Sequence, residues 1–375
     1  MQARVRLHLA LSHQEPDRVP IDLGGMSTTI EALAYKELLR FLGYENEQIE
    51  VFVRDHVVPS EQVLKEFGVD TRYVHYMPTK PWSPEPGLQV DEWGVGWEKK
   101  TEKSLYFEPV YYPLREAKRV EDLEKYRWPS APSEEQIAQW RATVKRLREE
   151  TDYAIVGDVI GLGIFETAWS LQGLDRFMIN IHRHLTFVEA LLDKVLEVKL
   201  KQYEAYLSAI GPYIDVINLS DDMGTQHGPI INPELYRKVV KPRQKILCQN
   251  IKEKTNAKVF LHSCGAISEL IGDFIDIGID ILNPVQVSAK GMGDTAWLKR
   301  EFGKDIVFWG GGCDSQHILP FGTPEEVERE VRRRIEDLAP GGGFVFAPIH
   351  NIQPGVPPEN IVMLFKAALK YGQYA

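Results

Sequence analysis

Residues 258–283 read KVFLHSCGAISELIGDFIDIGIDILN and contain one full unit of the pattern that decides the fold. An apolar run, Lys258–Leu261, is followed by a segment with helical spacing and then by a second apolar run, Asp280–Asn283. Short apolar runs between turn residues indicate buried strands, and strands that alternate with helices indicate a parallel sheet covered by helices. The stretch therefore predicts a strand–helix–strand unit.

The same alternation continues on both sides of this stretch. The other apolar runs are Tyr153–Gly157, Ile214–Leu219, Asp305–Trp309 and Gly343–Ala347, with two earlier candidates, Arg18–Leu23 and Thr71–Tyr76. Eight strands favour a closed barrel over an open doubly wound sheet, and no GxGxxG motif follows a strand. We therefore predict an α/β protein in which residues 1–375 form a single (β/α)8 TIM barrel with an N-terminal and loop elaboration covering one end.

Several helix boundaries have recognisable signals. Asn232-Pro233 and Thr323-Pro324 place a capping residue before a proline at the first helical position. Thr186-x-x-Glu189 has the pattern of a capping box. Pro242 is expected to kink or split the helix that begins at Pro233.

Residues 78–135 are rich in proline, aromatic residues and charge, and we interpret them as loops and hairpins over one end of the barrel. Their aromatic residues either line a pocket for a flat apolar substrate or form a small hydrophobic cluster under a long loop. These residues are Trp82, Trp93, Trp97, Tyr106, Phe107, Tyr111 and Tyr112.

The composition is that of an ordinary globular protein, with 43% hydrophobic and 26% charged residues. A net charge of -10 disfavours nucleic-acid binding. Three cysteines, no signal-peptide pattern at the N-terminus and no apolar stretch of membrane-spanning length predict a cytoplasmic protein without a membrane segment.

In a (β/α)8 barrel the active site lies where the strands run into the following helices. Polar and glycine-rich segments follow five of the predicted strands, which makes this end the candidate site. The segments are 221–227, 262–265, 283–286, 310–316 and 350–353.

His262 and Cys264 are two residues apart, so on an extended strand end both side chains point the same way. Imidazole and thiolate together suit zinc, and a catalytic zinc ion needs about three protein ligands. Cys313, His350 and Asp222 are the candidates for the third ligand. The alternative is a hydrogen-bonded histidine beside a small buried thiol. Asp221-Asp222 is either a carboxylate pair for acid–base chemistry or a turn cap beside a solvated side chain.

With these motifs in view, the chain resembles the uroporphyrinogen decarboxylase superfamily, and within it the cobalamin-dependent methyltransferase branch. The resemblance covers nearly the whole length. The segments that carry it are Glu15–Pro20, Asp91–Gly94, Phe165-Glu166, Asp221–Gly224, His262–Gly265 and Pro357–Asn360.

Two departures refine this resemblance. The arginine-rich segment with which the decarboxylases grip substrate carboxylates is replaced by Ile21–Ser27, which disfavours porphyrinogen decarboxylation. The coenzyme M methyltransferases of the branch have a late cysteine where this chain has Pro348–Gln353. The His350–Gln353 segment is similar instead to the subgroup found in corrinoid-dependent O-demethylase systems.

The resemblance implies a methyltransferase that moves a methyl group from a methoxylated aromatic to the Co(I) corrinoid of a partner protein. In this reading zinc is held by His262, Cys264 and Cys313, and the catalytic residues are Asp222, His350 and Asn351. The substrate would lie against Trp93, Gln286, Trp309, Gln316 and Gln353.

No Asp-x-His-x-x-Gly corrinoid motif is present, so the cobalamin is expected on the partner. A homodimer is left open. The alternatives are a zinc-dependent methylcobalamin:thiol methyltransferase, a decarboxylase with a new substrate, and a non-catalytic binding barrel.

Overall fold

A computed structural model describes residues 1–77, 88–101 and 104–374. Its centre is a seven-stranded parallel sheet in which each strand pairs with the next one along the chain, in the order β3, β7, β8, β9, β10, β11, β12. The strands are β3 (Thr71–Val74), β7 (Ala154–Gly157), β8 (Val216–Ser220), β9 (Lys258–His262), β10 (Ile281–Asn283), β11 (Val307–Trp309) and β12 (Phe344–Val345).

The segment around Ile21 closes this sheet into a ring. On one side, Asp22 N donates to Phe346 O at 2.8 Å, just beyond β12. On the other, Asp70 N donates to Ile21 O at 2.8 Å, just before β3. The predicted strand Arg18–Leu23 is thus present only as isolated bridges, since Pro20 has no N–H to donate. The (β/α)8 barrel is confirmed, and this short segment takes the place of its eighth strand.

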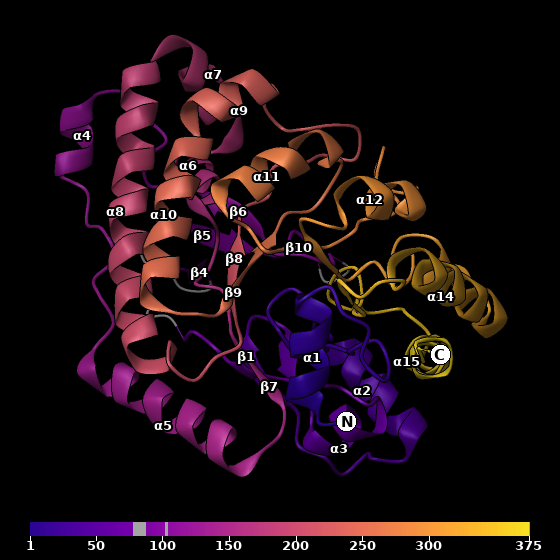
Figure 1. The fold of residues 1–375 in the computed structure, drawn as a ribbon. Helices are drawn as coiled ribbons and strands as arrows, with labels where there is room; N and C mark the ends of the chain where they lie inside the picture. The colour runs from indigo at the N-terminus through magenta and orange to yellow at the C-terminus, as the bar shows by residue number, and fades with distance from the viewer. Residues whose placement is uncertain (78–87, 102–103, 375) are drawn as a thin grey trace.

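Helices surround the barrel, and Figure 1 shows α8 and α10 on one side and α14 and α15 on the other. The longer helices are α2 (Ala32–Leu42), α5 (Glu134–Glu150), α6 (Ile164–Gln172), α7 (Leu174–Arg183), α8 (Leu185–Ile210), α10 (Lys241–Lys254), α12 (Thr295–Phe302), α14 (Pro324–Leu338) and α15 (Pro358–Tyr371). The shorter ones are α3 (Glu61–Glu66), α4 (Val120–Glu124), α9 (Pro233–Val239), η1 (Ser268–Leu270), α11 (Ile271–Ile277) and α13 (Ile318–Phe321). No helix in the described ranges is both long and apolar enough to cross a membrane.

Helix α1 (Ala3–Leu11) plugs the end of the barrel at which the strands begin. Its Leu7 and Leu11 belong to the cluster of buried side chains inside the ring, together with Val156, Phe260 and Val345. The interior is therefore a packed core, and any cavity must lie at the opposite end.

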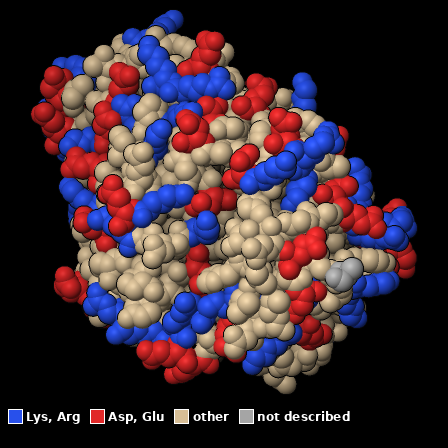
Figure 2. Space-filling view, viewed as in Figure 1, with Lys and Arg blue, Asp and Glu red and all other residues tan. Residues whose placement is uncertain are grey.

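The opposite end carries two small antiparallel sheets. One is the hairpin of β1 (Glu50–Val53) and β2 (His56–Val58), and the other is a meander of β4 (Gln89–Val90), β5 (Gly96–Glu98) and β6 (Glu108–Tyr111). Trp93 and Trp97 are buried in the meander. Trp82 lies outside the described residues. On the face drawn in Figure 2, acidic and basic side chains are interspersed.

Candidate metal centre and active site

The candidate site is built at the carboxyl ends of β8, β9 and β10. His262 is the last residue of β9, and its neighbours in the ladder are Ser220 and Asn283, the last residues of β8 and β10. Cys264 follows two residues later and brings its thiol Sγ to 3.3 Å from His262 Nε2. The parallel register of the three strands therefore delivers these polar ends to one place.

Asn283 fixes the orientation and the tautomer of His262. Its Nδ2 donates to Trp309 O at 2.9 Å, which turns its Oδ1 toward His262 Nδ1 at 2.6 Å. Because a carboxamide oxygen only accepts, His262 Nδ1 carries a proton, and the other ring nitrogen, Nε2, faces the Cys264 thiol. This arrangement, a histidine that donates its other ring N–H to a fixed oxygen, is typical of metal-binding histidines.

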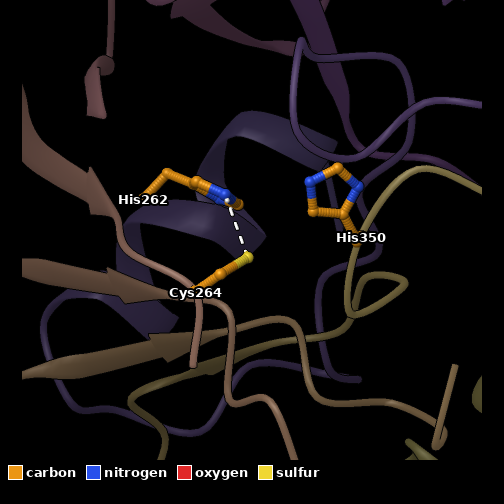
Figure 3. Close-up of side chains that lie close together, drawn as sticks. All are labelled: His262, Cys264 and His350. Atoms are coloured by element: carbon orange, nitrogen blue, oxygen red, sulfur yellow. Dashed lines mark hydrogen bonds between the residues drawn. The ribbon is translucent and has the colours of Figure 1, made fainter. Parts of the chain in front are cut away.

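His350 completes a group of three possible metal ligands. One ligand atom each from His262, Cys264 and His350 lies within 4.8 Å of the others. Figure 3 shows a ring nitrogen of His350 turned toward the other two side chains, which come from the opposite side of the gap. Around a tetrahedral zinc ion, bond lengths of about 2.0–2.3 Å place ligand atoms roughly 3.3–3.8 Å apart. The group therefore needs only a small contraction to hold a metal.

The surroundings of the other two possible ligands, His350 and Cys264, also suit a cation. Burial lowers the pKa of His350 to about 3, with the nearby His262 and His56 adding to the effect, so its imidazole is neutral. Burial also raises the pKa of the Cys264 thiol well above its ordinary value, and the carboxyl groups of Asp222 and Glu166 add to this. A bound cation would favour the thiolate that these surroundings disfavour.

The two predicted aspartates have different roles. Asp221 is buried, and its carboxylate accepts the backbone N–H groups of Phe165 and Glu166 at the start of α6. Asp222 reaches the cavity instead, where its Oδ1 accepts from Cys264 N at 2.7 Å and lies 3.8 Å from His262 Nε2. Asp221 is thus a helix cap, whereas Asp222 holds the Cys264 loop beside the metal-ligand group.

A cavity of about 380 Å³ opens over this group. Aromatic side chains from the hairpin and the meander form much of its wall, and Tyr106 stands edge-on to His350 with ring centroids 6.1 Å apart. The aromatic lining residues of the hairpin and the meander are Phe52, Trp93, Trp97, Tyr106 and Phe107. Tyr111 and Tyr112, which the sequence also suggested, do not line it. Its volume falls in the usual range of about 300–1,000 Å³ for small-molecule sites.

Three predicted site residues support the loops around the cavity. Gln286 Oε1 accepts from Gly265 N at 2.7 Å, which fixes the loop after β9. Asn351 Oδ1 accepts from Thr29 N at 2.9 Å, and its Nδ2 donates to Met26 O. Gln353 Nε2 donates to Asn351 O at 3.2 Å. None of the three lines the cavity, so their place is behind the site.

The structure places three other predicted site residues, Cys313, Trp309 and Gln316, away from the cavity. Cys313 does not join the metal-ligand group, because its thiol is buried in the hydrophobic core. Trp309 points into the closed barrel, where it is fully buried and donates from Nε1 to Asp22. Gln316 is exposed on a turn in which its backbone N–H is bound by Asp314. Trp309 ends β11, and Cys313 and Gln316 follow it, but none of the three lines the cavity.

Several cavity residues were not singled out as site residues from the sequence. Glu166 lines the cavity and accepts from Ser220 Oγ at 3.3 Å, and burial beside Asp222 and Asp221 raises its pKa well above the ordinary value. His56 lies 3.0 Å from Glu31 on the hairpin side. Glu166 lies in a segment that carries the family resemblance, so that resemblance could have identified it as a candidate site residue. For the hairpin residues, no spacing rule connects residue 56 to residue 262.

Barrel, cavity and metal-ligand group together define an enzyme-like (β/α)8 protein with its site at the carboxyl ends of the strands. Within that class, the uroporphyrinogen decarboxylase (URO-D) family model matches residues 107–371, and the chain belongs to this family. Curated relatives include the uroporphyrinogen decarboxylases of Staphylococcus aureus strain bovine RF122, 22% identical over 65% of this chain, and of Geobacter sulfurreducens, 23% identical over 71%. The matches span 67% and 74% of those relatives.

Among solved structures, a methyltransferase from Methanosarcina mazei has the same fold over its whole length. The TM-score is 0.68, with 20% sequence identity and 99% of both chains covered. At this identity the likeness describes the fold.

Proposed function

We propose that this protein is a methyltransferase that takes the methyl group of a methoxylated aromatic and passes it to the Co(I) corrinoid of a separate protein. The observation that carries the proposal is the convergence of His262, Cys264 and His350 at the edge of a cavity with aromatic walls. The shared fold with a methyltransferase, at 99% coverage of both chains, supports it.

Zinc is the metal that this donor set suits best. Two imidazoles and one thiol make a borderline-soft site, and three protein ligands leave one position open. The tautomer of His262 leaves its lone pair on Nε2, and burial keeps His350 neutral. His350 Nδ1 accepts from Asn351 N at 2.8 Å, so a metal at its Nε2 would have to displace the ring proton and this hydrogen bond. When bound, the metal would act as a Lewis acid on the ether oxygen and stabilise the phenolate that develops there.

The transfer breaks the bond between the methyl carbon and the ether oxygen, and the electron pair of that bond stays on the oxygen. Co(I) supplies the electron pair of the new carbon–cobalt bond. The phenolate then needs a proton, and Glu166, which lines the cavity, is the proposed donor, because burial beside Asp222 and Asp221 raises its pKa and favours its protonated form. The aromatic walls orient the ring, and Asp222 holds Cys264 in position.

The test follows Co(I) spectroscopically in a reduced corrinoid protein mixed with the zinc-loaded protein and a panel of methoxylated aromatics. We expect loss of Co(I) and release of the matching phenol, in equal amounts. His350→Ala should lower both the zinc content and the rate at least about 100-fold, as expected when one of three ligands is removed. Cys313→Ala is the control and should retain its zinc.

Two outcomes would contradict the proposal. If the fully zinc-loaded protein transfers a methyl group to Co(I) from none of the aromatic ethers tested, the proposed substrate class is wrong. If the same protein methylates a thiol from methylcobalamin instead, the chain belongs with the thiol methyltransferases, in which zinc activates the acceptor. Zinc retained by His350→Ala but lost from Cys313→Ala would overturn the ligand set.

A further inference from the structure

One cation faces the cavity with no hydrogen bond and no ion pair among the described residues. Of the described residues that line the cavity, Arg54 is the only lysine or arginine. Its guanidinium lies over the ring of Trp97 at 4.3 Å and 5.7 Å from the ring of Phe107. Across the described ranges this side chain has no hydrogen bond and no ion pair, although the carboxyl groups of Asp91 and Glu31 are near enough to attract it. An arginine is always charged and offers five N–H donors, so an unpaired one in a cavity is a ready site for an anion.

The turn that carries Arg54 holds it in place. Arg54 connects β1 to β2 with a φ of +50°, a left-handed conformation that is uncommon for residues other than glycine. The next residue, Asp55, pairs with Lys99, and its backbone oxygen accepts from Ala32 N at 2.8 Å. A backbone that is strained in this way and anchored through the next residue is typical of positions that place a functional side chain.

The carboxyl groups of the same cavity are already engaged within the protein. Asp91 accepts from Trp93 N, Val95 N and Trp97 Nε1, and Asp158 accepts from Met26 N and His75 Nδ1. Glu92 accepts from Gln202, Glu166 from Ser220 and Asp222 from Cys264. Glu31 lies 3.0 Å from His56 Nδ1, and Asp55 pairs with Lys99. The acids therefore build the wall, whereas Arg54 has donors left for a ligand.

We infer that Arg54 is a specificity-determining residue that binds an anionic group on the aromatic substrate, most simply a ring carboxylate. The inference rests on the proposed function and narrows its substrate class to methoxybenzoates. In this pose the methoxy group reaches His262, Cys264 and His350 across the cavity. The ring lies along Tyr106 and Phe107, which connect the two ends because Tyr106 contacts His350 and Phe107 lies beside Arg54. A guanidinium binds a carboxylate through two parallel N–H donors, which also fixes the angle of the ring.

The experiment compares three ligands that share the methoxy-substituted ring and carry an anionic, a neutral or a cationic group on it: 3-methoxybenzoate, 3-methoxybenzyl alcohol and 3-methoxybenzylamine. Binding to the full-length protein is followed by the fluorescence of Trp93 and Trp97, which line the cavity. We expect the benzoate to bind most tightly. Arg54→Gln should raise its Kd about 10- to 100-fold, the usual loss for a charged hydrogen-bonded pair. The same variant should change the Kd of the alcohol less than about twofold.

Further variants separate recognition from folding. Arg54→Lys keeps the charge but loses the two-pronged geometry, so an intermediate Kd for the benzoate is expected. Arg115→Gln is the matched control, since Arg115 forms an exposed pair with Asp175; its ligand binding should equal that of the wild type. An equal loss for all three ligands in Arg54→Gln would mean a structural role and would overturn the inference.

The wild-type protein alone can also refute it. Tighter binding of the benzylamine would mean that the carboxyl groups of the wall dominate, and equal binding of all three would mean that charge is not recognised. Because binding needs no Co(I), this result is independent of methyl transfer. A protein that binds benzoates through Arg54 but never methylates Co(I) would refute the proposed function alone. One that demethylates neutral and anionic ethers with the same KM would refute this inference alone.

Discussion

The protonation of a single carboxyl group, Glu166, links the site to the stability of the protein. Glu166 is 6% exposed at the first turn of α6 and lies near two aspartates. Its folded-state pKa is raised, mainly by burial and then by Asp222 and Asp221. In the unfolded chain the group titrates at its ordinary value of about 4.3.

The sign of the pH dependence follows from this difference. Above about pH 4.3 the unfolded chain has released the proton that the folded protein still binds, so the free energy of unfolding falls as pH rises. The slope for this one proton is at most about 1.4 kcal/mol per pH unit. We expect Glu166→Gln to remove that slope. The free energy of unfolding of the variant, relative to that of the wild type, should therefore increase from pH 5 to pH 8. Urea unfolding of metal-free protein at both pH values measures it, and a constant difference would contradict it.

At the residue scale, the sequence identified part of the site. His262 and Cys264 could be found because they share one strand end, where a spacing of two fixes the direction of both side chains. Cys313 was chosen over His350 and Asp222 as the third metal ligand, but the residues alone could not decide this, because it depends on how far apart three loops lie in space. Arg54 was missed because it lies on a hairpin with no motif, and only the fold brings it to the cavity.

At the scale of elements, two loops meet backbone to backbone beneath the metal-ligand group. Gly265 has a φ of +93°, and a Cβ there would lie 2.5 Å from Gly224 C and 2.6 Å from Gly224 O. The loop after β9 therefore packs directly on the loop after β8. This contact explains why a glycine follows Cys264 and why another follows Asp222-Met223.

Substituting this glycine should disturb both stability and the site. We expect Gly265→Ala to lower the free energy of unfolding by about 2–4 kcal/mol, from backbone strain and overpacking, and to weaken zinc binding by moving Cys264. Gly272→Ala is the matched control, because no atom lies within 4 Å of its added Cβ and its position in α11 favours alanine. Equal stability of the two variants would show that the close packing of the loops is not required.

Helix boundaries show the same division between local and tertiary signals. Asn232 and Thr323 cap their helices as predicted, and Pro242 separates α9 from α10, because these effects are local. The capping box predicted at Thr186 is wrong, since α8 already begins at Leu185 after His184. The preceding helix α7 ends only two residues earlier, and this tight connection decides where α8 starts.

At the scale of the whole molecule, the alternation of strands and helices was enough to predict the barrel, because each strand pairs with its successor. The weak point of the prediction was the closure of the ring. The segment 18–23 lacks a continuous ladder. A few backbone hydrogen bonds and a set of buried side-chain contacts that no sequence pattern predicts hold it between β12 and β3.

Asp70 is the centre of that closure. Its carboxylate accepts from Arg6 Nη1 at 2.6 Å, from Arg18 Nη1 at 2.8 Å and from Ile21 N at 2.9 Å, and the residue is 2% exposed. It therefore ties α1 and the closing segment to the start of β3. Removing the carboxylate would leave the mostly buried Arg6 and Arg18 with too few partners.

We expect Asp70→Ala to lower the free energy of unfolding by about 3–5 kcal/mol, the usual result of removing one partner of a buried ion pair. Amide hydrogen exchange should also speed up first in the closing segment and along β3 and β12, because the ring opens where the ladder is shortest. Denaturant unfolding and exchange mass spectrometry measure the two effects. Asp175→Ala, which removes an exposed pair with Arg115, is the control and should change neither. If Asp70→Ala behaves like that control, the barrel is closed by its backbone hydrogen bonds alone.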